Sequence, residues 1–547
     1  MLIDFRAVPA DTRIEADVCV IGAGAAGITL ALELHASNLE VCLLESGGVQ
    51  FSPETQDLAR GVSFQVGWPY QKLEATRIRT FGGTTTVWDG ACVPCTGIDF
   101  EKRDWVPHSG WPITRASLDP YYTRAEAVCE LGAGEYGAEL WGRFGQPSDA
   151  FDRDKLDVRF WRYSPTRFGA RYGDEIRRSK NIRLYLFANV THLRANEAGS
   201  AIDEIEVETL DGNRGTVAAR AYVLATGGIE NARLLLNASD VEPAGLGNRH
   251  DLVGRYFMEH SYYQSGFLVS EDLERLMQRY DHMQRGPLHV LAGVRLADSV
   301  QRRERTLDCC SLLDDRFHRD NPGVIATRRI LQDIRYGQMS PELGNKIYDI
   351  LSNLDAVLMA GIGAAVHGDS RHYEEKGVPV FTQAEQAPNP SNRVFLEPER
   401  DPLGLQRVSL DWRLGELDRR TIEVAVKQVG SEFARLGLGR VRIADWTLEA
   451  DDSGWRSGLH WGHHHMGTTR MSDDPKTGVV NADCRMHSVH NLYVASSSVF
   501  PTGGYANPTL TIVALAIRLA DHLRSELASR AVDLSGSDRG SAGALRG

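Results

Sequence analysis

The chain has 547 residues, of which 42% are apolar and 24% charged, and its formal net charge is −12. This length predicts two or three structural units around a large core. The acidic balance argues against nucleic acid or an anionic membrane as a partner, because both require a basic face. No apolar run reaches the ~18–20 residues of a membrane span. The first residues carry acids where a signal peptide needs basic and then apolar residues, so we expect a cytoplasmic protein.

Cysteine and histidine usage gives little support for a metal centre. Eight cysteines are few for this length, and we expect reduced thiols. Cys92 and Cys95 form a CxxC pair, but no second pair accompanies them. The consecutive histidines 463–465 invite a metal interpretation. Adjacent side chains in an extended segment point to opposite faces, however, so at most two could converge. We therefore expect no metal site.

A nucleotide-binding pattern lies near the N-terminus. The apolar run Val18–Ile21 has the length of a buried parallel strand. Glycines in GxGxxG spacing follow, then a helix-like segment at 28–34. A second buried-strand run, Val41–Leu44, ends in an acid. This order of strand, glycine turn, helix and strand predicts a dinucleotide site.

Each residue of this motif has a physical role. Gly22 permits a tight turn, Gly24 lets the backbone approach a pyrophosphate, and Gly27 lets helix and strand pack closely. The phosphates then lie at the positive end of the helix. Glu45 is placed to accept hydrogen bonds from a ribose diol. The predicted contacts are Gly22, Gly24, Ala25, Ala26, Gly27 and Glu45.

A second glycine pair lies in the segment GGTTTVW. Gly82 and Gly83 permit close approach to a flat ligand. The hydroxyls of Thr84 and Thr85 can bond ring edges, and Trp88 supplies a packing wall. An ordinary glycine turn before a strand is the alternative interpretation.

A later block, residues 181–238, alternates strand-like segments with turns. We predict strands at Tyr185–Val190, Ile205–Thr209 and Ala221–Ala225, the last running into Thr226-Gly227-Gly228. A helix at Ile229–Asn237 follows. This arrangement predicts a β-meander on the nucleotide-binding sheet that brings another glycine pair to the ligand. A strand-to-helix turn without chemical consequence is the alternative.

The middle of the chain, from about 260 to 449, is the least informative. We assign it to a substrate-binding domain, with candidate pocket loops at 361–363 and 381–386. Near the C-terminus, 509–523 reads as a buried helix with Pro508 at its first turn. Its N-terminus offers free N–H groups and positive potential to an electron-rich ligand. A histidine acting as a general base suits this region, because imidazole titrates near working pH.

These motifs together resemble the glucose–methanol–choline (GMC) oxidoreductase family. The resemblance is carried by GAGAAG, GGTTTVW, H-x-x-G-T and GGYANPTLT, in that order. The C-terminal third looks most like pyranose 2-oxidase and the bacterial sugar and glycoside 3-oxidoreductases. The resemblance implies an α/β (α+β overall) fold, with a Rossmann-like FAD-binding domain and a second, mainly antiparallel-sheet substrate-binding domain.

The resemblance also implies the domain organisation. An FAD-binding domain would be assembled from 1–98, 181–260 and 456–530. Residues 99–180 would connect to the substrate side, and 261–455 would form the substrate-binding domain. The Ser/Gly-rich tail, 531–547, is expected to be disordered.

Functional residues are carried over by motif position. His464, which precedes x-x-Gly-Thr, would be the catalytic base, and Asn507 would hold the substrate hydroxyl. Pyranose 2-oxidase attaches its flavin through a histidine at the position of Val87, so we predict FAD held without a covalent bond. The remaining predicted cofactor contacts are Val190, Thr226, Gly227, Ser497, Asn507 and Thr509.

The resulting hypothesis is oxidation of a secondary hydroxyl of a sugar or glycoside, at C3 or C2, to a ketone. Hydride would pass to FAD, and dioxygen, a quinone or an electron-transfer protein would reoxidise it. A GMC enzyme acting on a non-sugar alcohol is the alternative within the family. A nicotinamide-dependent dehydrogenase also uses GxGxxG and Glu45, but would not need the Gly82 loop. A non-catalytic flavin protein would not need His464 and Asn507.

Overall fold

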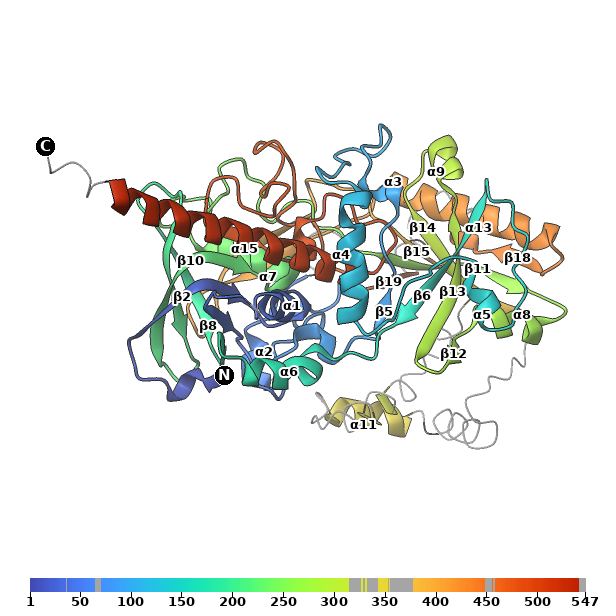
Figure 1. The fold of residues 1–547 in the computed structure, drawn as a ribbon. Coiled ribbons are helices and arrows are strands. Elements are labelled where there is room, and N and C mark those ends of the chain that lie inside the picture. Colours follow the sequence, from blue (N-terminus) through green and yellow to red (C-terminus); the bar gives the residue numbers. More distant parts are fainter. Residues whose placement is uncertain are drawn as a thin grey trace, which may run out of the picture.

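The computed structural model describes residues 1–35, 37–63, 70–313, 326–327, 330–331, 343–352, 354, 377–447, 455 and 458–540. Two large sheets dominate this part of the chain (Figure 1), and three further strands form a small third sheet. The candidate pocket loop at 361–363 and the tail residues 541–547 lie outside the described residues.

The first sheet has eight strands in the order β1-β7-β3-β2-β10-β9-β8, with β20 beside β10. The strands β1, β7, β3, β2, β10 and β20 are parallel, and β8–β9–β10 form the predicted antiparallel meander. The bounds are β1 Leu2–Asp4, β2 Thr12–Ile21, β3 Val41–Leu44, β7 Ile182–Leu186, β8 Asn189–Ala195, β9 Ile202–Glu208, β10 Arg214–Leu224 and β20 Leu492–Val494. The end of β2, Val18–Ile21, and all of β3 are apolar and buried, as expected for strands inside a parallel sheet.

The second sheet has nine strands in the order β18-β11-β15-β14-β13-β6-β5, with β12 on β13 and β19 on β11. Its described pairs are all antiparallel, as predicted. The bounds are β5 Ala91–Cys92, β6 Leu156–Tyr163, β11 Ser261–Val269, β12 Met283–Arg285, β13 Leu288–Leu296, β14 Cys309–Leu313, β15 Gly377–Ala384, β18 Arg440–Ile443 and β19 Leu459–Trp461. Strands β5 and β19 join this sheet from segments assigned above to FAD binding.

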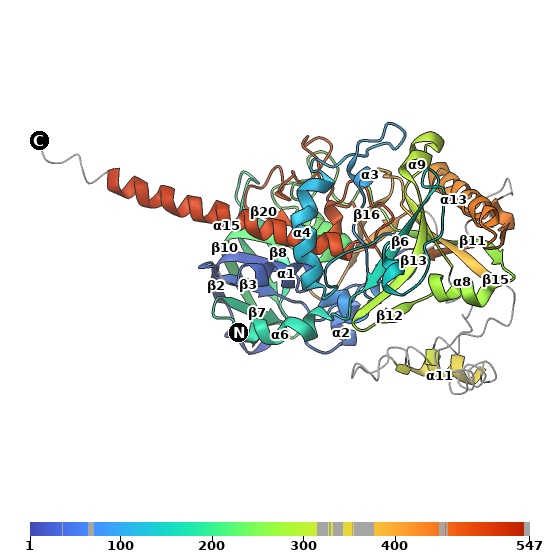
Figure 2. The same ribbon diagram turned by 45° about the vertical axis from the view of Figure 1, so that its right-hand side comes forward.

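The small sheet pairs β16 with β17 and β17 with β4. Its bounds are β4 Gly61–Val62, β16 Arg393–Arg400 and β17 Gln406–Asp411. The helices are α1 Ala25–Glu33, α2 Pro53–Asp57, α3 Gly97–Phe100, α4 Arg115–Val128, α5 Leu140–Arg143, α6 Phe168–Arg178, α7 Gly227–Asn237, α8 Leu273–Tyr280, α9 Asp298–Glu304, α11 Leu343–Ser352, α13 Glu416–Arg435 and α15 Thr509–Gly540. Helix α15 packs against α1 and α4 beside the parallel sheet, whereas α13 packs on the antiparallel sheet (Figures 1 and 2).

Two glycines of the first motif are required by backbone packing. Gly22 has φ +101°, and a Cβ there would lie 2.7 Å from the carbonyl oxygen of Ala225. A Cβ on Gly27 would lie 1.9 Å from the carbonyl oxygen of Gly22. The turn after β2 therefore accepts no side chain at Gly22, and the first turn of α1 accepts none at Gly27.

Three expectations about local structure were wrong. The predicted strand Tyr185–Val190 is divided between β7 and β8, because Phe187 has φ +57° and turns the chain. The candidate loop 381–386 is mostly strand, since β15 continues to Ala384. Helix α15 continues to Gly540, ten residues into the segment expected to be disordered, and extends away from the sheets in Figure 2. No helix among the described residues is long and apolar enough to cross a bilayer.

Candidate active site

A cavity of about 850 Å³ opens where the first sheet meets the second. It lies beyond the carboxyl ends of β2, β3 and β10, where ligands bind in open α/β sheets. The predicted residues that line it are Gly22, Gly24, Ala25, Ala26, Glu45, Gly83, Thr84, Thr85, Trp88, Val190, Thr226, Gly227, His464, Ser497, Asn507 and Thr509. Gly27 and Gly82 are outside the lining, because both serve backbone packing: a Cβ on Gly82 would lie 2.8 Å from the amide nitrogen of Gly169.

The nucleotide end of the cavity fits a dinucleotide. A Cβ on Gly24 or Gly227 would meet nothing within 4 Å, so both glycines leave room for a ligand. Gly24 caps α1 without any side-chain hydrogen bond, which leaves the first amide N–H groups of the helix facing this space. The Glu45 carboxylate accepts hydrogen bonds from the amides of Ala23 at 3.0 Å and Gly47 at 2.8 Å. Burial raises the pKa of Glu45, and these bonds oppose that shift.

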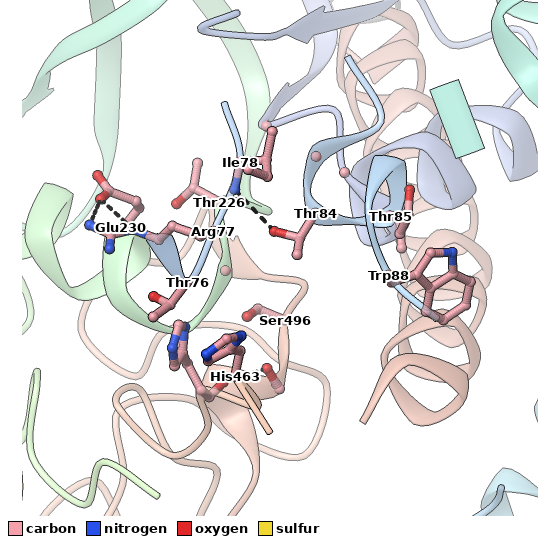
Figure 3. A pocket seen from close by; sticks show the side chains of 18 of the residues that line it. Thr76, Arg77, Ile78, Thr84, Thr85, Trp88, Thr226, Glu230, His463 and Ser496 are labelled. Carbon is pink, nitrogen blue, oxygen red and sulfur yellow. Dashed lines mark hydrogen bonds and ion pairs between the residues drawn. The ribbon is translucent and has the colours of Figure 1, made fainter. Parts of the chain in front are cut away.

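The Gly82 loop forms one wall of the cavity (Figure 3). Residues Gly83–Thr86 form a 3-10 turn. The Thr85 hydroxyl donates to the Gly82 carbonyl at 2.5 Å, and the Thr84 hydroxyl accepts from the Ile78 amide at 3.2 Å. The Trp88 indole N–H donates to the Thr166 carbonyl at 3.0 Å, which fixes the ring as a rigid wall. The threonine hydroxyls therefore brace the loop as well as lining the cavity.

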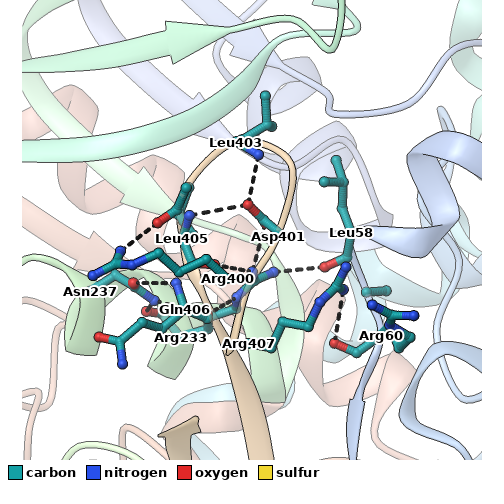
Figure 4. A network of polar contacts seen from close by, with 12 residues as sticks. Leu58, Arg60, Arg233, Asn237, Arg400, Asp401, Leu403, Leu405, Gln406 and Arg407 are labelled. Carbon is teal, nitrogen blue, oxygen red and sulfur yellow. Dashed lines mark hydrogen bonds and ion pairs between the residues drawn. The ribbon is translucent and has the colours of Figure 1, made fainter. Parts of the chain in front are cut away.

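A cluster of arginines and acids, which no local motif predicted, borders the same cavity. Glu230 pairs with Arg77 and with Arg79, each at 2.6 Å, and Figure 3 shows the Arg77 pair opposite Trp88. Burial opposes ionisation of Glu230, but the neighbouring arginines hold the pKa of this carboxyl far below its usual range. Arg233 extends the network to Asp401 at 2.7 Å, in the turn between β16 and β17 (Figure 4).

The three consecutive histidines have three different partners. His463 Nε2 lies 2.8 Å from the Gln71 side-chain oxygen, and His465 Nε2 lies 3.2 Å from the Tyr70 hydroxyl. His464 Nδ1 instead lies 2.8 Å from Nδ1 of His260. Within the described residues, no group of three or more His, Cys, Asp or Glu side chains is arranged to hold a metal ion.

His464 and Asn507 meet at the other end of the cavity. His464 Nε2 lies 3.3 Å from Asn507 Nδ2. The Asn507 side-chain oxygen accepts from Trp161 Nε1 at 2.8 Å and from Gln383 Nε2 at 3.1 Å, so its NH₂ group faces His464. Burial lowers the pKa of His464 well below its usual value, and the adjacent histidines lower it further. A neutral imidazole therefore faces the amide and the cavity, in a position to accept a proton.

The residues that orient this pair were missing from the predictions. Trp161 comes from β6, Gln383 from β15, and His260 immediately precedes β11. All three belong to the antiparallel-sheet side and are separated from Asn507 by more than a hundred residues. No local motif marks them. Only the pairing of the strands brings them to the cavity.

Comparisons with known proteins agree with this geometry. Residues 388–516 match the GMC oxidoreductase family, and residues 17–77 match an FAD-binding domain. The chain is therefore an FAD-binding oxidoreductase. Within that class, the match over residues 388–516 is to the GMC oxidoreductases, the family that the sequence motifs resemble.

The chain is similar to several characterised proteins. It is 26% identical to the 2-methyl-1,2-propanediol dehydrogenase of Mycolicibacterium austroafricanum, over 93% of this chain and 95% of that protein. It is 45% identical to a C-glycoside 3-oxidase of Arthrobacter globiformis, over 25% of each chain. The fold is similar to that of the formate oxidase of Aspergillus oryzae, with a TM-score of 0.55 and 17% identity over 95% of this chain and 99% of that one. This structural similarity supports the two-domain fold.

Proposed function

We propose that this protein oxidises a secondary hydroxyl of a sugar or glycoside to a ketone, with FAD held non-covalently. The observation that carries the proposal is the His464–Asn507 pair, which faces a cavity whose far end suits a dinucleotide. FAD supplies the two-electron hydride acceptor when bound. The protein supplies the proton acceptor, the orientation of the substrate and the surrounding electrostatics.

The hydrogen bonds of His464 and Asn507 support a different proposed role for each side chain. His464 Nε2 takes the proton of the substrate hydroxyl, which raises electron density on the oxygen and makes the adjacent C–H a better hydride donor. Asn507 Nδ2–H donates to the same oxygen and does not titrate. The N-terminus of α15, at Thr509, adds positive potential at the cavity wall. A substrate hydroxyl held by both side chains would be oriented before its proton is transferred.

The lining of this end of the cavity favours a sugar. Trp161, Tyr163, Tyr262 and Trp461 contribute aromatic surface, and Gln383 contributes an amide. Polar groups that converge on a ligand allow a site to select a polyhydroxylated substrate. The C-glycoside 3-oxidase relative supports this class of substrate.

Non-covalent attachment is supported by the side chain at position 87, where pyranose 2-oxidase carries its flavin-bound histidine. Val87 lines the cavity and carries no nucleophilic atom. Acid precipitation should release all of the flavin into the supernatant. Flavin that stays with the precipitated protein would contradict this part of the proposal.

The decisive experiment is an anaerobic visible spectrum during addition of glucose, then simple O-glucosides, then a C-glycoside. Bleaching of the flavin bands by any of these supports the proposal, and admitting air then tests whether dioxygen reoxidises the flavin. His464→Ala is the control, expected to keep its flavin and to bleach at least about 10²-fold more slowly. Bleaching of that variant at the wild-type rate would show that His464 is not the base.

A small diol is the second candidate substrate, because the relative matched over 93% of this chain is a 2-methyl-1,2-propanediol dehydrogenase. The same titration separates the two candidates. Bleaching by 2-methyl-1,2-propanediol, with none by the sugars, would replace the sugar proposal by oxidation of a small alcohol.

A further inference from the structure

His260 is a buried histidine that makes two directional hydrogen bonds at the active site. Its Nδ1 lies 2.8 Å from His464 Nδ1, and its Nε2 lies 2.7 Å from the Gly504 carbonyl oxygen. The two imidazole rings meet edge to face, with centroids 5.0 Å apart and an interplanar angle of 80°. A histidine–histidine contact of this kind requires one ring to donate and the other to accept.

The Gly504 carbonyl decides which ring donates. A carbonyl oxygen only accepts, so His260 Nε2 must carry its hydrogen. A neutral His260 then has a lone pair at Nδ1, and His464 Nδ1 must donate to it. The lone pair of His464 is left on Nε2, the nitrogen that faces Asn507 Nδ2. Burial lowers the pKa of His260 to about 4, which keeps this ring neutral near pH 7.

The backbone around the pair is held by a neighbouring carboxylate. The segments around residues 260 and 464 run antiparallel, with Ser261 opposite Trp461 and Met258 opposite Met466. The second segment has two more residues between these pairs, and His463 in this bulge has φ +58°. One oxygen of Glu259 accepts from the amides of His260 at 2.9 Å and His464 at 2.7 Å.

This carboxylate replaces the cross-strand acceptors that the bulge removes. Its second oxygen accepts from the Tyr70 hydroxyl, which anchors it from a third segment. Both histidines therefore have a backbone amide bound to the same oxygen atom. The spacing between the two rings is fixed by the main chain, not only by the bond between them.

The acceptor at Gly504 is also fixed. Gly504 has φ +58°, and a Cβ there would lie 2.6 Å from the Asp99 carboxylate. Its amide hydrogen-bonds to Glu385, which is itself paired with Arg103 at 2.7 Å in a fully buried contact. The residue whose carbonyl receives the His260 hydrogen is thus held at its amide by Glu385 and packed closely at its α-carbon against Asp99.

We propose that His260 is a positioning residue that holds His464 in the Nδ1–H tautomer, so that Nε2 is the nitrogen available to the substrate. The proposal deepens the proposed function and rests on His464 being the base. A ring with the wrong tautomer presents N–H to the substrate hydroxyl and cannot take its proton, although the geometry is intact. In serine proteases the equivalent loss of tautomer control lowers kcat about 10⁴-fold.

Two substitutions separate the hydrogen-bond acceptor of His260 from the shape of its ring. His260→Asn places an amide oxygen near the position of Nδ1, so it keeps an acceptor for His464. His260→Phe keeps the ring shape and removes both polar atoms. We expect the rate of anaerobic flavin reduction to fall about 10²- to 10³-fold in His260→Phe and less than about tenfold in His260→Asn. Equal losses in both variants, or none in His260→Phe, would overturn the proposal.

A spectroscopic measurement tests the tautomer without turnover. Long-range ¹H–¹⁵N correlation spectra of protein labelled with ¹⁵N-histidine distinguish the Nδ1–H and Nε2–H forms. The His464 signals are those lost in His464→Ala. We expect the Nδ1–H form in the wild type and His260→Asn, and a mixture in His260→Phe.

The two readouts separate this proposal from the proposed function. An Nε2–H form of His464 in the wild type would overturn the role of His260, whatever the substrate is. Unchanged flavin reduction in His464→Ala would instead remove the base assignment on which the role rests. That result would overturn both the proposed role of His464 as the base and the proposed role of His260.

Discussion

The two ends of the cavity differ in the atoms that form them: main-chain atoms at one end and side chains at the other. At the nucleotide end, Gly24, Gly227 and the start of α1 offer main-chain atoms and open space. At the substrate end, Asn507 and His464 are oriented by side chains from other strands. A backbone site tolerates change on the surrounding side chains but not at its glycines. A side-chain site depends on each member of its hydrogen-bond network.

The largest loss of stability should come from adding a Cβ at Gly27, where helix α1 packs directly on the backbone of Gly22. In Gly27→Ala, the new Cβ would lie 1.9 Å from the Gly22 carbonyl oxygen, and no flexible side chain can move to relieve it. We expect destabilisation of more than about 3 kcal/mol, with little soluble protein and no bound flavin. Denaturant unfolding and flavin content measure both effects.

Gly24→Ala is the matched control, three residues away. Its Cβ would meet no protein atom within 4 Å, so the apoprotein should unfold at the wild-type midpoint. Flavin affinity should still fall, because the methyl group enters the ligand space. Wild-type flavin affinity in this variant would show that Gly24 does not face the cofactor.

At the substrate end, Asn507→Asp should reduce the rate of flavin reduction by about 10²-fold or more. A carboxylate can still accept from Trp161 and Gln383, but it has no hydrogen to donate toward His464 or the substrate oxygen. Its charge would also raise the pKa of His464. Stopped-flow measurements across pH should show a new loss of rate on the acid side. A rate within twofold of wild type would contradict the role of the amide.

A smaller loss is expected when the support of Asn507 is weakened. Trp161→Phe removes the donor to the Asn507 oxygen, leaving Gln383 to hold the amide, and should slow flavin reduction about tenfold. Trp105→Phe is the control, since its indole donates to the Thr306 carbonyl at 2.8 Å and Trp105 does not line the cavity. Similar rates in the two variants would show that the Trp161 bond has no effect on turnover.

In the wild type, we expect the rate of flavin reduction to change little with pH near neutrality. Because the pKa of His464 is lowered, the ring stays neutral and able to accept a proton until the pH falls well below 6.5. The rate of flavin reduction at low substrate concentration should therefore be level from pH 8 to 6.5 and decrease only below that range. A decrease with a midpoint at or above 6.5 would show that the base is not desolvated.

The same contrast explains how much could be predicted from the sequence. The nucleotide end is encoded in contiguous motifs, so Gly22, Gly24 and Glu45 could be predicted from their spacing, and all three line the cavity. His464 and Asn507 were found because family motifs mark them. Trp161, His260 and Gln383 were not found, because their positions depend on the register of an antiparallel sheet. The register of these strands cannot be deduced from the spacing of residues along the chain.

Loop details were also beyond prediction. Gly82 was assigned to ligand approach, but its conformation serves a contact with the backbone of Gly169. The role of a glycine at a positive φ depends on what lies opposite, and that partner is 87 positions further along the chain. Similarly, Arg77 and Glu230 form a network only because two distant segments border one cavity.

The 3.3 Å contact between His464 and Asn507 also joins the two halves of the molecule. The backbone of Asn507 lies just before α15, beside the parallel sheet, whereas its side chain is held by Trp161 and Gln383 of the antiparallel sheet. Sliding of one sheet past the other would therefore strain these hydrogen bonds, and with them the contact to His464, before either core is exposed to water. The catalytic rate therefore depends on how the two sheets are aligned with each other. On gentle heating, activity should decline ahead of both flavin release and the global unfolding transition.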